Sequence, residues 1–466
     1  MTNILGSMKQ DGSRLVLHPA DVKGRWMSRR RAVFALLIGF YVLAPFIPVG
    51  GHPLIQLDVE HRRFYLFGST FNAQDVWLVL LLLLGFLFGL LFVTAWKGRV
   101  WCGWGCPQTV FLEGVYRPIE RLFDGSREAR LRLANAPLSA SKVFRRLGKH
   151  LVFLIVSAAI AHTATALFVS PRELWLMIEE GPAHHLEAFG LTLGFTAILM
   201  FNFSWFREQF CTVLCPYGRL QSVLHDRDSV TVAYRDARGE PRGKLQAKPL
   251  GDCVDCKRCV VVCPTGIDIR EGLQMECIAC TQCVDACDDV MEKVKRPRGL
   301  IAFASQNELA GQPRNTLRPR LAIYAGLMVI SLVTLGVSLA TRTPFEANVY
   351  RARGGMPFVI DGEVVRNPFE VHVFNKNPEK ARFTLEVHSP VEAQIVIGTP
   401  TLQLESLTDA RVPVVISIER AKLNVPIDLT LVVTDQTNGS SREQTVRFLS
   451  PSPPRGERVG VRVREP

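Results

Sequence analysis

The sequence predicts an α-helical membrane protein that carries a small cysteine-rich domain and ends in an all-β domain. Three observations support this fold class. Five apolar runs approach the roughly 20 residues that cross a bilayer. All twelve cysteines lie in closely spaced motifs. Near the carboxyl end, apolar and polar residues alternate as they do in strands. With 466 residues, the chain is long enough for two or three domains.

The apolar runs predict about five transmembrane helices, at residues 32–48, 76–96, 151–169, 186–206 and 321–340. The first run is short and ends in Pro45 and Pro48. Its long basic lead-in, with no small-residue cleavage site after it, argues against a signal peptide. Gly85 and Gly89 in the second run form a GxxxG motif, which predicts helix packing.

Basic residues predict the orientation in the membrane. The net charge is +12, and Lys and Arg gather in the segments 1–31, 97–149 and 207–320. The loops 49–75 and 170–187 hold only three basic residues, Arg62, Arg63 and Arg172. The positive-inside rule then places the amino terminus and both long basic loops in the cytoplasm of a bacterial inner membrane. The segment after Arg342 is expected in the periplasm. No basic groove studded with aromatic residues is visible, so we expect no nucleic-acid partner.

These boundaries give a six-part domain map. It comprises a cytoplasmic amino-terminal segment (1–31), four transmembrane helices with a cytoplasmic loop (32–206, loop 97–149), a cytoplasmic segment with the cysteine-rich domain (207–320, domain about 250–292), a fifth transmembrane helix (321–341), a periplasmic β domain (342–450) and a disordered tail (451–466). In the β domain, runs such as 369–374 and 383–387 alternate on either side of a turn at 375–380. Later runs at 412–418 and 429–434 continue the pattern and predict an antiparallel sandwich.

The cysteine-rich domain carries the bacterial ferredoxin spacing twice, C-x2-C-x2-C-x3-C from Cys253 and again from Cys277. In such runs three thiolates of one loop bind one cubane, and the fourth cysteine binds the other. We therefore predict a ferredoxin-like domain with two [4Fe–4S] clusters. Their ligand sets are Cys253, Cys256, Cys259 and Cys287 for one cluster, and Cys263, Cys277, Cys280 and Cys283 for the other.

Zinc is the alternative metal for these cysteines, but zinc binds a single set of four ligands, usually supplied as separated pairs of cysteines. The doubled run of eight favours iron–sulfur clusters. The second motif has Asp288 and Asp289 where a proline is usual. Their negative charge is expected to lower the potential of the nearby cluster.

Two further cysteine pairs form a CxxxCP repeat, each directly after an apolar run. They are Cys102 with Cys106 and Cys211 with Cys215. If helical, the two thiols of a pair share a face, and two pairs at one membrane face could build a soft four-sulfur site. The following proline suits a helix start, whose free N–H groups stabilise a thiolate. Copper binding, a redox-active dithiol and simple apolar packing remain open.

Other residues give weaker signals. His162 lies within the third apolar run, where an ionisable residue is either a functional group or a neutral side chain bonded to a neighbouring helix. No nucleotide-binding fingerprint or hydrolytic triad is present. Electrons must therefore come from a partner protein, a small soluble donor or a membrane quinol.

Together these motifs resemble one family, the cytochrome c oxidase accessory proteins called CcoG, FixG or RdxA. The resemblance covers about residues 25–450 and is carried by residues 100–110 (VWCGWGCPQTV), 207–217 (REQFCTVLCPY), 263–270 (CPTGIDIR), 272–277 (GLQMEC) and 296–300 (RPRGL). It implies an immunoglobulin-like periplasmic domain. It also implies a role in assembly of the cbb-type cytochrome c oxidase, with Cu(II) reduced to Cu(I) for insertion and with oxidase subunits or copper chaperones as partners.

The cytoplasmic electron donor is left unidentified. Two rival functions are considered. One is a quinol dehydrogenase that feeds a periplasmic reductase, because related polyferredoxin membrane proteins share the CxxxCP elements. The other is a non-enzymatic assembly scaffold whose β domain binds oxidase subunits.

Overall fold

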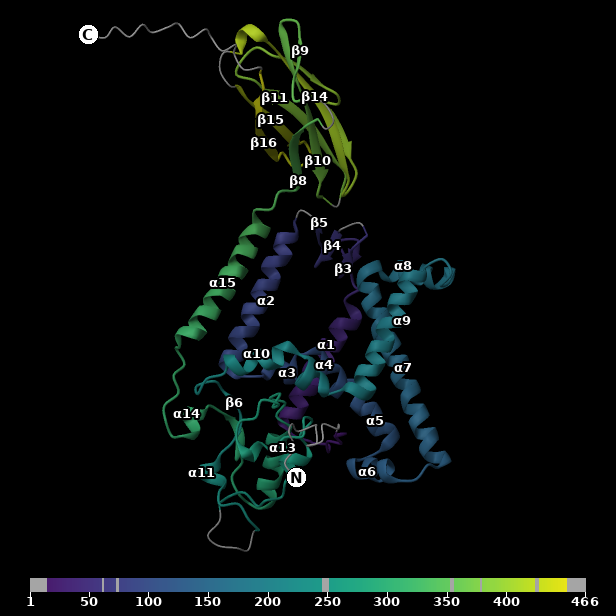
Figure 1. Ribbon diagram of the computed structural model, residues 1–466, viewed down its shortest axis with the longest axis vertical. Helices are drawn as coiled ribbons and strands as arrows, with labels where there is room; N and C mark the ends of the chain where they lie inside the picture. The colour runs from purple at the N-terminus through teal and green to yellow at the C-terminus, as the bar shows by residue number, and fades with distance from the viewer. Residues whose placement is uncertain are drawn as a thin grey trace, which may run out of the picture. The chain divides into compact units, whose positions relative to one another are not determined.

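The computed structural model describes residues 15–60, 63–72, 75–244, 251–352, 356–377, 379–423 and 427–450. Contacts divide the chain into two compact units, Met1–Val337 and Ser338–Pro466 (Figure 1). The predicted disordered tail, 451–466, lies outside the described residues.

Within these residues, four helices are long and apolar enough to cross a membrane. They are α2 (Val76–Lys97), α7 (Ala140–Val169), α9 with its π-helical extension η3 (Leu186–Phe206) and α15 (Pro319–Ala340). The first predicted run instead contributes to α1, Arg25–Leu43, which is 19 residues long. Because α1 begins in the basic segment and ends before Pro45, its apolar part is too short to match the other four. The membrane-helix fold class is confirmed. The predicted number of spanning helices was five, and the described residues contain four, because α1 does not qualify.

The long helices pack in pairs. Helices α7 and α9 lie side by side, where Thr165 Oγ1 and Thr192 Oγ1 are 2.8 Å apart (Figure 1). A Cβ added to Gly85 of α2 would lie 3.0 Å from Leu332 of α15, and one added to Gly89 would lie 3.3 Å from Met328. The GxxxG motif therefore allows α2 and α15 to approach closely, as predicted.

Short helices lie at one end of the long helices. Among the short helices, α3, α4 and α10 lie between the long helices and α13 (Gln282–Lys293) (Figure 1). The short elements are α3 (Val100–Trp104), α4 (Pro107–Phe111), η2 (Leu112–Tyr116), α5 (Arg117–Asp124), α6 (Arg127–Asn135), η4 (Phe210–Leu214) and α10 (Pro216–Leu224). At the opposite end lie α8 (Pro171–Glu180) and a small sheet, β3 (Ile55–Asp58), β4 (Arg63–Leu66) and β5 (Ser69–Asn72). A further small sheet pairs β1 (Pro48–Val49) with β2 (His52–Pro53).

The cysteine-rich domain is built around a two-stranded sheet, in which β6 (Thr231–Tyr234) pairs with β7 (Ile301–Ala304). Its other elements are α11 (Asp236–Gly239), α12 (Arg258–Val261), η5 (Ile269–Glu271), α13 (Gln282–Lys293) and α14 (Gln306–Leu309). Val232, Ile269, Met291 and Leu300 are buried together with several cysteines. The domain core is therefore made partly of thiols, as expected of a domain that closes around metal clusters.

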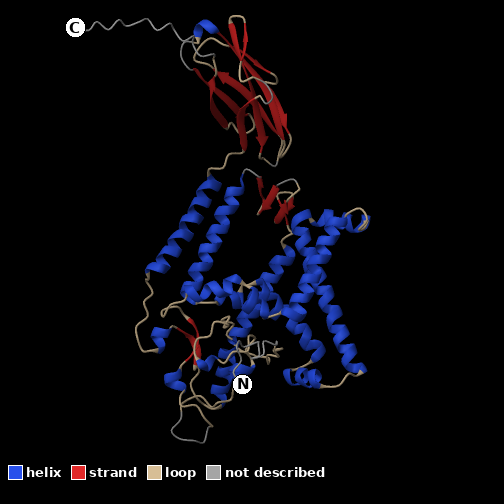
Figure 2. Ribbon diagram, in the orientation of Figure 1, coloured by secondary structure: helices blue, strands red, loops and turns tan. Residues whose placement is uncertain are grey.

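The second unit is a two-sheet β domain (Figure 2). One sheet has the order β12-β14-β10-β8, with β9 also paired to β10, and the other has the order β13-β11-β15-β16. The strands are β8 (Phe345–Arg351), β9 (Val359–Asp361), β10 (Val364–Asn375), β11 (Ala381–His388), β12 (Gln394–Ile397), β13 (Thr401–Leu404), β14 (Asp409–Glu419), β15 (Ile427–Asp435) and β16 (Ser441–Phe448).

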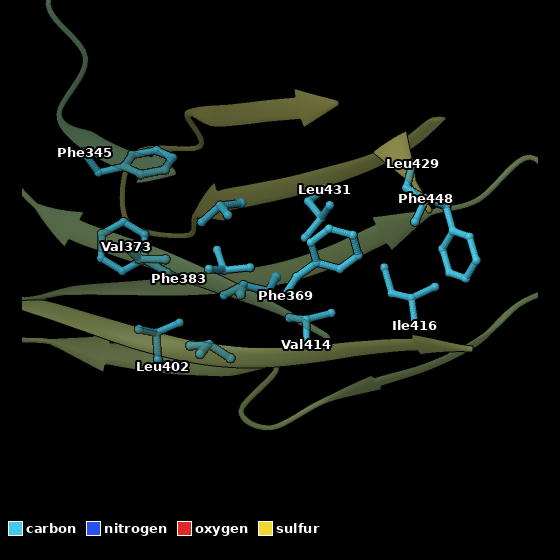
Figure 3. Close-up of a cluster of buried hydrophobic side chains, with 14 of the residues drawn as sticks. Phe345, Phe369, Val373, Phe383, Leu402, Val414, Ile416, Leu429, Leu431 and Phe448 are labelled. Carbon is cyan, nitrogen blue, oxygen red and sulfur yellow. The ribbon is translucent and has the colours of Figure 1, made fainter. Parts of the chain in front are cut away.

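Alternate residues of these strands form the core of the β domain. Figure 3 shows Phe369 of β10 between Leu431 of β15 and Val414 of β14. The strands predicted at 369–374, 383–387, 412–418 and 429–434 all occur, and the predicted antiparallel sandwich is confirmed.

Candidate metal centres

The two ferredoxin motifs fold into matching loops. The middle cysteine of each motif, Cys256 or Cys280, is flanked by residues with positive φ. These are Asp255 (49°) and Lys257 (55°) in the first loop, and Ala279 (53°) and Thr281 (65°) in the second. Residues other than glycine rarely adopt this conformation, which costs about 1–3 kcal/mol each and gathers at functional sites. The shared strain marks both loops as binding loops.

The eight cysteines gather in two sets. The charge of Cys287 interacts with those of Cys259, Cys256 and Cys253, and these four are called the outer thiol set. The charge of Cys283 interacts most strongly with those of Cys280, Cys277 and Cys263, and these four are called the inner thiol set. The structure thus brings together the predicted groups, including the exchange of the fourth cysteine between loops.

The inner thiol set lines a cavity whose walls also include Cys259, Ile267, Ile269 and Ile278. Burial raises the pKa of Cys277 to about 11 and that of Cys283 well above its usual value. These thiols would therefore be protonated without metal and would release protons on binding it. An all-thiol donor set in an apolar cavity fits a [4Fe–4S] cluster.

The outer thiol set is more open, because Cys256 is exposed while Cys253, Cys259 and Cys287 are buried. Burial, with the charges of the neighbouring thiols and of Asp288, raises the pKa of Cys287 to about 12. Asp288 accepts a hydrogen bond from the Gly299 N–H at 2.9 Å. The acidic neighbour found in the sequence therefore lies beside the outer set.

The two CxxxCP elements form a structural repeat. Cys106 and Cys215 are the N-cap residues of α4 and α10, and the following prolines are the first helical residues. The Cys106 N–H donates to the Trp101 carbonyl at 2.9 Å, and the Cys215 N–H donates to the Phe210 carbonyl at 2.8 Å. Each second cysteine thus closes a five-residue backbone turn before a helix begins, as the prolines predicted.

All four CxxxCP thiols lie close enough for their charges to interact, as predicted for elements at one membrane face. The buried Gln221 of α10 links the two elements, because its Nε2 donates to Cys102 Sγ at 3.4 Å. Burial raises the pKa of Cys106, although the N–H groups of Gln108 and Thr109 oppose this effect. Burial also raises the pKa of Cys211 to about 12. The helix-start effect therefore has the predicted sign, but burial outweighs it.

One CxxxCP thiol, Cys102, packs in the same buried cluster as a cysteine of the inner thiol set. Cys102, Ile278 and Cys280 form one buried cluster, against which Tyr217 packs. The close approach depends on Gly103, because a Cβ there would lie 2.3 Å from the Ile278 carbonyl oxygen. The Trp104 Nε1 also donates to the Ala279 carbonyl at 3.2 Å. Packed residues, Cys102, Ile278 and Cys280, therefore join the two thiol sites.

Buried charges surround this junction, and the sequence analysis did not identify them. Glu113 Oε1 lies 2.6 Å from Arg117 Nη1, and Glu113 Oε2 lies 3.9 Å from Arg30 Nη1. Burial alone would raise the pKa of Glu120, but Arg207 and Lys149 lower it to about 2. Glu113 and Arg117 lie one helical turn apart, but the other partners are about 29, 83 and 87 residues apart, so hydropathy and spacing carry no signal for them.

His162 lies apart from these thiols. Its Nδ1 is 2.7 Å from the Ala158 carbonyl oxygen one turn earlier in α7. It lines a cavity of about 380 Å³ between α7, α8 and α9, whose lining residues include His185 and Met177 but no cysteine. The structure therefore does not bring His162 to the predicted soft-metal site.

The fold and its thiol sites define a membrane iron–sulfur protein of the electron-transfer class. Family models agree. One described as a 4Fe-4S dicluster domain matches residues 206–306, one described as a 4Fe-4S binding domain matches 78–125, and one described as an IG-like fold at the C-terminal of FixG matches 335–451. The last match confirms the expected immunoglobulin-like fold of the β domain.

The chain belongs to the family of RdxA and FixG. It is 36% identical to Protein RdxA of Cereibacter sphaeroides over 389 residues, 80% of this chain and 82% of the relative. It is 33% identical to Nitrogen fixation protein FixG of Rhizobium meliloti over 435 residues, 83% of this chain and 82% of the relative. Ferredoxin-type protein NapH of Escherichia coli is 23% identical over 306 residues, 61% of this chain and 95% of the relative.

Among solved structures, a FixG-related protein from Vibrio parahaemolyticus aligns with 23% of this chain and 97% of that chain. The two are 25% identical, with a TM-score of 0.21.

Proposed function

We propose that this protein reduces Cu(II) to Cu(I) at the four CxxxCP thiols and so supplies copper for biogenesis of the cbb-type cytochrome c oxidase. In this proposal the outer thiol set (Cys253, Cys256, Cys259, Cys287) and the inner thiol set (Cys263, Cys277, Cys280, Cys283) each hold one [4Fe–4S] cluster. The observation that carries the proposal is the single buried cluster that Cys102 forms with Ile278 and Cys280. It puts a soft copper ligand beside a cluster ligand.

The chemistry suits the residues. Thiolates are soft ligands that favour Cu(I), so Cys102, Cys106, Cys211 and Cys215 would stabilise the reduced product. Within the described part of the chain, no three His, Cys, Asp or Glu side chains form a ready site for one metal ion. We therefore expect copper to draw the four thiols together and to displace their protons.

The reaction transfers one electron to each Cu(II). A reduced electron-transfer protein of the cytoplasm supplies that electron and is oxidised by one equivalent. When bound, the [4Fe–4S] clusters provide one-electron redox centres, whose potentials in proteins span about −700 to +450 mV. The chain itself holds the copper, excludes water from the junction and keeps the two thiol sites in contact.

The basic segments support an orientation in the bacterial inner membrane with the amino terminus and the cysteine-rich domain in the cytoplasm. The β domain would then lie in the periplasm. There its two-sheet surface would be available to oxidase subunits or copper chaperones.

A fourfold variant, C102S/C106S/C211S/C215S, tests the proposal. We expect it to keep its iron, its acid-labile sulfide and its cluster absorbance but to lose Cu(II) reduction, measured with a Cu(I)-specific chelator after anaerobic reduction. H162A serves as the control and should keep full activity, because His162 lies outside the thiol site. Full activity in the fourfold variant would remove the copper site from the CxxxCP elements.

The same preparations separate the rival functions. Oxidation of a quinol analogue without Cu(II) reduction would favour a quinol dehydrogenase. Normal oxidase assembly in cells that carry only cluster-free variants would favour a scaffold role for the β domain.

A further inference from the structure

Helix α1 contains a buried positive charge. Arg30 of α1 is completely buried, whereas its neighbours Arg29 and Arg31 are exposed. A buried guanidinium is costly unless its charge and its N–H groups have partners. The position of Arg30 therefore calls for a specific negative neighbour.

A carboxylate of the cysteine-rich domain fixes that position. Asp285 of α13 accepts hydrogen bonds from the backbone N–H groups of Trp26 and Met27, at 3.2 and 2.7 Å. These are free N–H groups in the first turn of α1, which carry partial positive charge. Gly24 makes this approach possible, because a Cβ there would lie 2.2 Å from Asp285 Cγ. Helix α1 is thus fastened to the domain that holds both thiol sets.

The partners of Arg30 are incomplete. Its Nε donates to the Gly103 carbonyl at 2.8 Å, next to Cys102. Its Nη1 lies 3.9 Å from Glu113 Oε2, too far for a hydrogen bond. Neither Nη atom has a hydrogen-bond partner among the residues that the structure describes. Two buried N–H-bearing nitrogens thus remain available at the junction of the two thiol sites.

With a cluster bound, the inner thiol set would supply negative charge near Arg30, because Arg30 holds the Gly103 carbonyl and a Cβ at Gly103 would lie 3.1 Å from Cys280 Cα. The positive charges of Arg30 and of the buried Arg117 both act on Cys280. Thiolates bound to iron keep negative charge on sulfur, and that charge grows when the cluster is reduced. Positive charge and N–H groups beside the sulfurs therefore favour the reduced state and raise the potential.

We propose that Arg30 is a positioning residue for electron transfer, which raises the reduction potential of the cluster held by the inner thiol set above that of the outer set. At the outer set, the acidic Asp288 acts on Cys287, and at Cys259 the ion-paired Arg270 and Asp268 act with opposite signs. The difference favours electrons on the inner set, next to Cys102. The inference rests on the ligand sets proposed above but not on copper as the substrate.

Redox titration monitored by electron paramagnetic resonance, without copper, tests the inference in the full-length protein. In R30Q we expect the reduction equilibrium of one of the two clusters to shift about tenfold toward the oxidised state. This shift lowers the potential of that cluster by about 59 mV for one electron. The other potential should stay unchanged. R30K should stay near wild type because the charge is kept, and the exposed neighbour R31Q should have no effect.

E113Q provides a test of opposite sign. It removes the carboxylate that partly neutralises Arg30 and Arg117, so the same potential should rise. If R30Q binds no cluster, E113Q and R30K still decide the question. Wild-type potentials in all variants, or a shift of E113Q and R30Q in the same direction, would overturn the inference. If the wild-type protein fails to reduce Cu(II) but R30Q still shifts one cluster potential, this inference stands and the proposed function is wrong.

Discussion

The inner and outer thiol sets share one loop conformation but differ in burial and in the charges around them. Both loops flank their middle cysteine with left-handed residues, and both continue into a helix. The inner cysteine Cys280 is buried against Cys102 and lies near Arg30 and Arg117. Its counterpart Cys256 is exposed. In our proposal the duplicated loop therefore serves two roles, one as a solvent-exposed electron entry and one as a buried electron exit.

The comparison shows why sequence spacing alone gives the ligands but not the direction of electron flow. Spacing decides which thiols can share a cluster. Charge and burial, contributed by segments far away in sequence, decide which cluster is reduced more easily.

The largest expected effect separates the two sets by removing one ligand from each. C280S and C256S should each lower the iron content from about eight to about four atoms per chain. When the variants are reduced with dithionite and freed of the excess before Cu(II) is added, C280S should lose Cu(II) reduction, because the set that packs near Cys102 is destroyed. C256S should keep most of it, because dithionite bypasses the solvent-exposed entry. Iron analysis and the Cu(I) chelator assay give both readouts, and equal loss of activity in the two variants would contradict the assigned roles.

A smaller effect is expected when the junction is widened. In G103A the new methyl group would collide with the Ile278 carbonyl, 2.3 Å from the added Cβ. We expect α3 to move away from the inner loop, at a cost of about 1–3 kcal/mol in the free energy of unfolding. Cu(II) reduction should slow several-fold while the iron content stays at wild type.

G194A in α9 is the matched control, since nothing lies within 4 Å of a Cβ at that position. G194A should change the free energy of unfolding little and should leave the rate of Cu(II) reduction unchanged. A G103A protein that reduces Cu(II) at the wild-type rate would show that the packing of Cys102 with Ile278 and Cys280 is not the electron path.

Much of the fold follows from the sequence because its signals are local. Apolar runs predicted α2, α7, α9 and α15, and alternating residues predicted the strands of the β domain. The first run, predicted at 32–48, is instead part of a helix from Arg25 to Leu43, because its start reaches back into the basic segment and it ends before Pro45.

The junction could not be predicted in the same way, because it depends on contacts between distant segments. Nothing in the spacing of Cys102 and Cys106 indicates that Cys280 lies beside them. Arg30 illustrates the limit most clearly. In the sequence it is one of three adjacent arginines, which the positive-inside rule explains equally well. Only the packing of α1 against α13 distinguishes the buried arginine from its exposed neighbours.

The most direct test of the central claim is a single-turnover reaction of the wild-type protein. The protein is reduced anaerobically, freed of reductant, and mixed with one equivalent of Cu(II). We expect the paramagnetic signal of Cu(II) to disappear at the same rate as the oxidised cluster absorbance returns. Persistence of the Cu(II) signal while the clusters stay reduced would contradict it, and so would an equal rate in the C102S/C106S/C211S/C215S variant.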